Sequence, residues 1–135
     1  MRLDIKDLFE AAKRAREGSY SPYSGYSVGA ALLCDDGTVY TGCNIENASL
    51  TPTVCAERVA FFKALSDGKR AFTAIAVAGG KHELEPCAPC GVCRQVMMEF
   101  CDPDTFEIVL DLGDGLSIMK LRDLLPCGFG PINMK

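Results

Sequence analysis

The spacing of hydrophobic residues along the chain changes several times, and each regular stretch predicts one structural element. Three stretches with apolar side chains at helical spacing are predicted to form helices: residues 4–17, 55–66 and 91–100. Four short apolar runs are predicted to form buried strands: residues 28–34, 39–43, 71–78 and 106–110. Gly18 is expected to end the first helix, because glycine is favoured just beyond a helix C-terminus.

Polar stretches rich in turn residues separate these elements. Residues 35–38, Asp-Asp-Gly-Thr, predict a hairpin between the first two strands. A last strand is indicated at residues 116–119, and a short helix at residues 121–125. Loops are expected at three places: residues 19–24, 44–54 and 79–89.

The order of these elements predicts the fold class. The hairpin gives an antiparallel strand pair, whereas strands that alternate with helices imply a parallel segment. We therefore expect an α/β fold, a three-layer α/β/α sandwich with a mixed sheet of about five strands. A length of 135 residues corresponds to a single domain, residues 1–135. The site is expected at strand-to-helix junctions along one edge of the sheet.

Composition and charge narrow the function classes. The chain is 48% hydrophobic and 24% charged, as is typical of a globular protein, and its net charge of −4 argues against a nucleic-acid partner. Residues 1–18 are charged throughout and lack the apolar segment of a secretory signal. No apolar run approaches the roughly 18 residues of a membrane span. We therefore expect a cytoplasmic protein without a membrane partner.

The chain has eight cysteines, which in a reducing compartment more often bind metal or perform redox chemistry than form disulfides. Residues 86–95, PCAPCGVCRQ, contain three of them, Cys87, Cys90 and Cys93, as two overlapping Cys-x-x-Cys pairs. Cys55 stands at another predicted helix start, where backbone N–H groups and the helix dipole stabilise a thiolate. Three thiolates at two such helix starts would form a catalytic zinc site, which keeps one position for water.

Glu57 follows Cys55 by two residues and could reach a zinc-bound water without being a ligand. Two other interpretations stay open at this point. The cysteines could form a structural zinc site, with Cys87 or His82 as the fourth ligand, or a Cys-x-x-Cys pair could have a thioredoxin-like redox role.

Four segments then connect the chain to a known family: SPYSGYSVGAALL at residues 21–33, GCNIENAS at 42–49, CAERVA at 55–60 and PCGVCRQV at 89–96. They include the zinc-deaminase pattern, Cys-x-Glu followed by Pro-Cys-x-x-Cys. With these segments in order, the chain resembles the small homotetrameric cytidine deaminases whose zinc is held by three cysteines. The resemblance implies hydrolytic deamination of cytidine and 2′-deoxycytidine, with zinc-bound hydroxide attacking C4 and Glu57 moving the protons.

The resemblance also implies roles for individual residues. Its zinc ligands are Cys55, Cys90 and Cys93, which leaves Cys87 as the additional cysteine. Arg58 and Gln95 correspond to residues that support the zinc ligands. The residues corresponding to substrate contacts are Asn44 and Glu46 for the ribose, and Tyr26, the backbone carbonyl of Ala56 and Phe129 for the base.

Phe129 is expected to reach the active site of a neighbouring subunit in a homotetramer. Leu50 stands where relatives often have an aromatic residue that also reaches a neighbour. The alternatives are a deaminase of another cytosine nucleoside analogue and a non-catalytic interaction module stapled by zinc.

Overall fold

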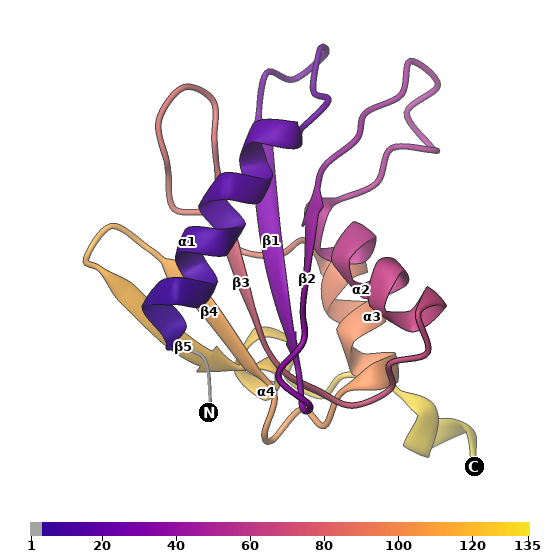
Figure 1. The fold of residues 1–135 in the computed structure, drawn as a ribbon. Coiled ribbons are helices and arrows are strands. Elements are labelled where there is room, and N and C mark those ends of the chain that lie inside the picture. Colours follow the sequence, from indigo (N-terminus) through magenta and orange to yellow (C-terminus); the bar gives the residue numbers. More distant parts are fainter. Residues whose placement is uncertain (1–3) are drawn as a thin grey trace.

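The computed structural model of the protein describes residues 4–135 and contains one mixed sheet with helices on both faces (Figure 1). The helices are α1 (Ile5–Ala15), α2 (Ala56–Ser66), α3 (Gly91–Phe100) and α4 (Leu121–Leu124), with 3₁₀ turns η1 (Arg16–Gly18) and η2 (Pro131–Met134). The strands are β1 (Ser27–Cys34), β2 (Val39–Cys43), β3 (Phe72–Gly80), β4 (Glu107–Asp111) and β5 (Leu116–Lys120).

The five strands lie in the order β2-β1-β3-β4-β5. β3 and β4 are parallel, and every other neighbouring pair is antiparallel. The predicted mixed sheet is therefore confirmed, with its parallel pair joined by a crossover that contains α3. Because α3 follows the carboxyl end of β3, its first turn lies at a strand-to-helix junction.

Several predicted bounds shift by one residue, and three differences are larger. Gly18 does not cap a helix that extends to residue 17, because α1 ends at Ala15 and the chain tightens into the 3₁₀ turn η1, a common ending of an α-helix. β3 runs two residues beyond the predicted end at residue 78, to Gly80. The 3₁₀ turn η2 near the C-terminus is an element that the apolar pattern did not predict.

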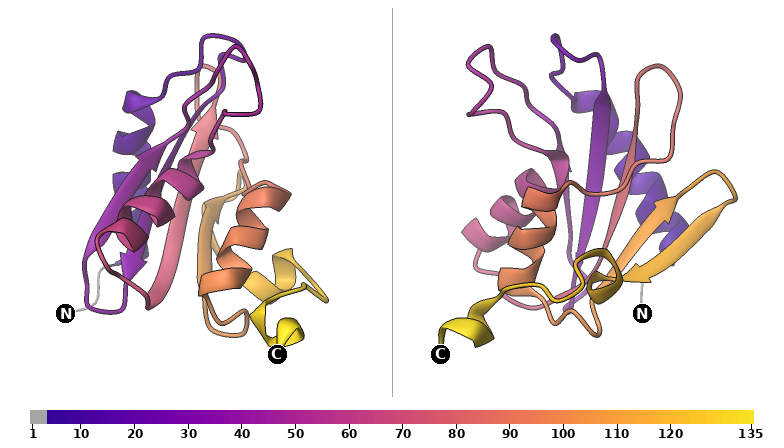
Figure 2. Two further views of the ribbon diagram at one scale, coloured as in Figure 1. Left: turned by 90° about the vertical axis from the view of Figure 1, so that its right-hand side faces the viewer. Right: turned by 180° about the vertical axis from the view of Figure 1, so that it is seen from behind.

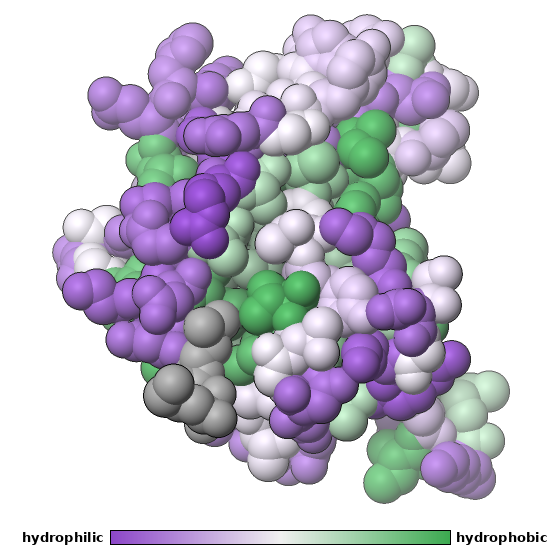
Figure 3. Space-filling model, in the orientation of Figure 1, coloured by the Kyte–Doolittle hydropathy of each residue, from purple (hydrophilic) through white to green (hydrophobic). Residues whose placement is uncertain are grey.

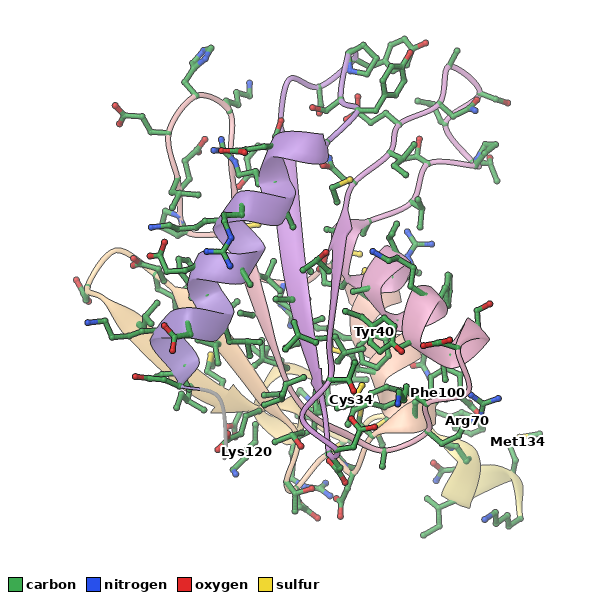
Figure 4. The ribbon with its side chains drawn as sticks, in the orientation of Figure 1. Cys34, Tyr40, Arg70, Phe100, Lys120 and Met134 are labelled. Atoms are coloured by element: carbon green, nitrogen blue, oxygen red, sulfur yellow. The ribbon has the colours of Figure 1, made fainter. Side chains whose placement is uncertain are left out.

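Two hydrophobic cores fill the spaces on either side of the sheet. Leu8, Phe9 and Ala12 of α1 pack against one face, while α2 and α3 cover the other (Figure 2). The larger core lies on the α2–α3 side, where Cys34, Tyr40 and Phe100 point toward the same region (Figure 4). This three-layer arrangement holds the starts of α2 and α3 on the same face of the sheet.

A glycine on β2 sets how closely α2 approaches the sheet. A Cβ atom added to Gly42 would lie 2.4 Å from the carbonyl oxygen of Ala56, so only glycine permits this contact. Ala56 is the first residue of α2 and is fully buried. The close contact therefore fixes the start of α2, with Cys55 and Glu57 on either side of Ala56, against the end of β2.

The outer surface over α1 is largely hydrophilic, whereas apolar side chains are visible at the end of the chain, residues 131–135, which projects from the body (Figure 3). Ile132 and Met134 are 78% and 76% exposed. No helix within residues 4–135 combines the length and the apolar character required to cross a membrane.

Candidate active site and metal centre

Three thiols from two helix starts lie together beside the sheet. Cys55 is the N-cap of α2, Cys90 is the N-cap of α3, and Cys93 lies in the first turn of α3. The Sγ atoms of Cys55 and Cys90 are 3.6 Å apart, and those of Cys90 and Cys93 are 3.5 Å apart. Two thiolates on a tetrahedral zinc ion, each about 2.3 Å from the metal, are separated by about 3.8 Å. The cluster therefore fits zinc with three protein ligands.

The surroundings of the cluster favour a thiolate at Cys55. Arg58 Nη2 lies 3.4 Å from the Cys55 sulfur, and both N-caps face the positive ends of helix dipoles. Hydrogen bonding by Cys93, together with Arg58 and Cys90, lowers the pKa of Cys55, whereas the same pairing and burial raise the pKa of Cys93. A thiolate is the form of cysteine that binds zinc. The donor set and its charge environment thus both suit a divalent metal.

Glu57 is a buried acid next to these thiols. It is 4% exposed and is the one buried charged side chain among residues 4–135. Burial raises the pKa of its carboxyl to about 7, because water no longer solvates the carboxylate. A carboxyl that titrates near neutral pH and faces a cavity is suited to accept and return protons.

A cavity of about 350 Å³ opens in front of the thiols and Glu57. It is within the size range of small-molecule sites, which is about 300–1,000 Å³. The predicted site residues that line it are Tyr26, Asn44, Cys55, Ala56, Glu57 and Cys90. The structure therefore brings together residues from the loop before β1, the loop after β2, and the starts of α2 and α3.

Asn44 and Glu46, the residues predicted to hold ribose, also order the loop before β1. The Asn44 Oδ1 atom accepts a hydrogen bond from the backbone N–H of Val28, and its Nδ2 donates to the carbonyl of Tyr26 over 2.8 Å. Glu46 accepts bonds from the backbone N–H groups of Tyr23 and Ser24 and from the Ser24 hydroxyl. Asn44 lines the cavity, whereas Glu46 is not among its lining residues.

Hydrogen bonding also favours the ionised form of Glu46. The Ser24 hydroxyl, followed by the two backbone N–H groups, holds the pKa of the Glu46 carboxyl below its usual range. The charge of this carboxylate makes a phosphate group close to Glu46 unfavourable, because the two negative charges repel each other.

Tyr26 and Ala56, the residues predicted to contact the base, both line the cavity. Burial, with a further contribution from Cys87, raises the pKa of the Tyr26 hydroxyl to about 12. The Tyr26 hydroxyl therefore stays protonated, and the side chain presents a neutral aromatic ring. The carbonyl oxygen of Ala56 lies close to Gly42 of β2, so its predicted role in reading the base stays a prediction.

Phe129 lies outside the cavity of its own subunit and is 56% exposed. Gln95, predicted to support the zinc ligands, donates from Nε2 to the Phe129 carbonyl over 2.7 Å. Its amide thus faces the C-terminal segment, and a role at the metal stays a prediction. That segment continues to Met134, which lies far from the sheet (Figure 4).

Neither Cys87 nor His82 belongs to the group of potential metal ligands in the described part of the chain. Cys87 lines the cavity beside Tyr26, and His82 is exposed in the loop after β3. The structure therefore offers three protein ligands for zinc and no fourth from these two residues.

Arg94 makes two contacts that sequence reasoning missed. Its Nε donates to the carbonyl of Pro89, and its Nη1 donates to the carbonyl of Leu124, both over 2.7 Å. No sequence pattern indicates a contact with Leu124, which is 30 residues away along the chain.

Comparisons with known proteins agree with this site. The sequence model described as the cytidine and deoxycytidylate deaminase zinc-binding region matches residues 3–108. A cytidine deaminase from Sporosarcina psychrophila is 47% identical over 94% of this chain and 92% of its own. One from Halalkalibacterium halodurans is 48% identical, over 94% of this chain and 95% of its own.

A solved structure shows the same fold. The crystal structure of cytidine deaminase from Burkholderia pseudomallei superposes with a TM-score of 0.86 and 51% identity, covering 94% of this chain and all of that one. Fold, thiol cluster and buried acid together define a zinc-binding deaminase. The chain belongs to the cytidine and deoxycytidylate deaminase family.

Proposed function

We propose that the chain catalyses the hydrolytic deamination of cytidine and 2′-deoxycytidine, giving uridine and 2′-deoxyuridine with release of ammonia. The observation that carries this proposal is the position of Glu57, buried beside three zinc-binding thiols and facing a cavity that fits a small ligand. The reaction replaces the amino group on C4 of cytosine by an oxygen atom from water. It therefore requires an activated water and a group that moves protons.

Cys55, Cys90 and Cys93 would hold one zinc ion per subunit. When bound, zinc lowers the pKa of a coordinated water from about 15.7 to about 7 and supplies a nucleophile at neutral pH. Three thiolates give a zinc site one excess negative charge, which weakens the metal as a Lewis acid. The Arg58 guanidinium, 3.4 Å from the Cys55 sulfur, offsets this charge.

Glu57 would act as the proton carrier. Its carboxylate would take the two protons of the attacking water one after the other, and its carboxylic acid would deliver the first to N3 of the base and the second to the departing amino group. Because burial brings its pKa to about 7, both protonation states are accessible near neutral pH.

The polar residues near the cavity favour a free nucleoside as substrate. Asn44 can donate to a ribose hydroxyl, and Glu46 can accept from one. The charge of Glu46 opposes a phosphate on the sugar, and the Tyr26 ring offers an aromatic surface to the base. Polar groups that bind the sugar hydroxyls select substrates that carry those hydroxyls.

We also propose that residues 1–135 act as a single domain within a homotetramer that shares its active sites. The side chain of Phe129 is 56% exposed although its carbonyl is bonded to Gln95 of α3, and Leu50 is 72% exposed with a positive φ of 66°. Exposed apolar residues of this kind are suited to contacts with another chain, because aromatic side chains are enriched at interfaces. Phe129 would then cover the base in a neighbouring active site.

Dilution is expected to reduce specific activity in parallel with dissociation of the tetramer. A separated subunit lacks the aromatic residue of its neighbour, so its site is incomplete. Sedimentation velocity across a concentration series, measured beside the initial rate of cytidine loss, tests this. A fully active monomer would overturn the shared site while leaving the proposed chemistry intact.

The zinc-loaded protein is expected to consume cytidine, followed by ultraviolet absorbance, and to release one ammonia per cytidine. A strong chelator should abolish the reaction, and added zinc should restore it, because the nucleophile depends on the metal. Tightly bound zinc without ammonia release would instead indicate an interaction module. Ammonia release from another cytosine nucleoside, but not from cytidine, would indicate the analogue deaminase.

A further inference from the structure

Arg94 connects two parts of the chain that are distant in sequence. Its Nε donates to the carbonyl of Pro89 and its Nη1 to the carbonyl of Leu124, both over 2.7 Å. Pro89 directly precedes the metal ligand Cys90, and Leu124 is the last residue of α4. One guanidinium therefore joins the metal-binding loop to the start of the C-terminal segment, defined here as residues 124–135.

The contact with Pro89 satisfies a polar group in an apolar place. Pro89 is less than 2% exposed, and a buried carbonyl without a hydrogen-bond partner destabilises the folded state. Proline has no backbone N–H, so the carbonyl is its one backbone hydrogen-bonding group. Arg94 thus holds the peptide that leads into Cys90, and the planar guanidinium can do so while also reaching a second carbonyl.

Helix α3, which carries Arg94, also contacts the C-terminal segment at Phe129 and Gly130. Gln95 donates to the Phe129 carbonyl over 2.7 Å. A Cβ atom added to Gly130 would lie 3.1 Å from Cγ of Met98, so the segment lies closely against α3. The helix that carries two of the three thiols therefore also positions this segment.

We propose that Arg94 is a positioning residue that couples zinc retention to the placement of the C-terminal segment. Loss of the bridge frees the peptide before Cys90 and loosens one ligand of the metal. The coupling is reciprocal, because any free energy that links two binding events acts in both directions. Zinc therefore also orders the C-terminal segment. The inference rests on the zinc site of the proposed function, but not on the identity of the substrate.

The test compares Arg94→Ala and Arg94→Lys with wild type as zinc-loaded protein. A coloured chelator records the rate of zinc release at 25 °C, and hydrogen exchange records the protection of residues 124–135. Release from Arg94→Ala is expected to be roughly 10–100 times faster, the usual effect of removing support from a metal ligand. Residues 124–135 should exchange faster in this variant, and also in wild type stripped of zinc.

Arg94→Lys keeps the charge but replaces the planar guanidinium, which donates to two carbonyls, with a single ammonium group. Faster release of zinc is therefore expected in this variant too. The matched control is Arg122→Ala, which removes an arginine of α4 that pairs with exposed Asp104 and should release zinc at the wild-type rate.

The inference would be overturned if Arg94→Ala or Arg94→Lys released zinc at the wild-type rate. It would also be overturned if Arg122→Ala released zinc as fast as the Arg94 variants. If Arg94→Ala does not fold, Arg94→Lys decides. Absence of zinc from the wild-type protein would instead refute the proposed function itself.

Discussion

The Glu57→Gln variant is expected to keep its zinc and its fold while losing nearly all turnover of cytidine. Glutamine has the shape of glutamate but cannot take up or release a proton at neutral pH. Because Glu57 is the buried acid beside the thiols, no other carboxyl in the cavity can replace it. General acid–base catalysis contributes roughly 10²–10⁴-fold, so kcat should fall by at least this factor.

Zinc content, circular dichroism and kcat measured on the same preparation test this expectation. The matched control is Glu99→Gln, which makes the same change at an exposed position of α3 and should keep wild-type kcat. Near-normal turnover in Glu57→Gln would remove this residue from the mechanism. Loss of zinc in the variant would show that Glu57 supports the metal rather than the proton transfers.

The second large effect concerns the two overlapping Cys-x-x-Cys pairs. Cys90→Ser is expected to lose its zinc and, with it, its turnover, because a serine hydroxyl is a poor zinc ligand at neutral pH. Zinc content should fall from about one per subunit to below roughly one tenth. Cys90 lies 3.6 Å and 3.5 Å from its two partner sulfurs, so its removal leaves only two thiol ligands.

Cys87→Ser is the matched control, since it makes the same change three residues earlier. Cys87 lies outside the cluster, so this variant should keep one zinc per subunit. Metal analysis after dialysis against a weak chelator decides between the two cysteines. The assignment would be reversed if Cys87→Ser lost zinc and Cys90→Ser retained it.

Much of the fold could be predicted because its information is local. The apolar period distinguishes helices from strands, and the Asp-Asp-Gly-Thr turn predicts the hairpin between β1 and β2. The end of α1 and the extension of β3 could not be predicted in this way. Helix endings vary by one or two residues, and β3 gains its last residues by pairing with β1 as far as Ser27 and Gly80.

Side-chain direction at the site depends on contacts that are distant in sequence. The sequence motif gives the position of Gln95 but not its contacts. Only the folded chain brings the carbonyl of Phe129 to the Gln95 amide. Arg94 reaches Leu124 for the same reason. The local sequence around Cys87 is similar to that around Cys90. Only the distances between sulfur atoms show that Cys90, and not Cys87, belongs to the cluster.

The sequence by itself determined the class of fold, the residue types of a zinc deaminase and the helix starts on which the thiols lie, since these follow from local spacing. The tertiary structure decided which sulfur atoms meet, how deeply Glu57 is buried and therefore how far its pKa rises. Burial and distance are properties of packed elements, and Gly42 shows the dependence directly. One missing side chain on β2 lets α2 approach and places Cys55 and Glu57 at the cavity.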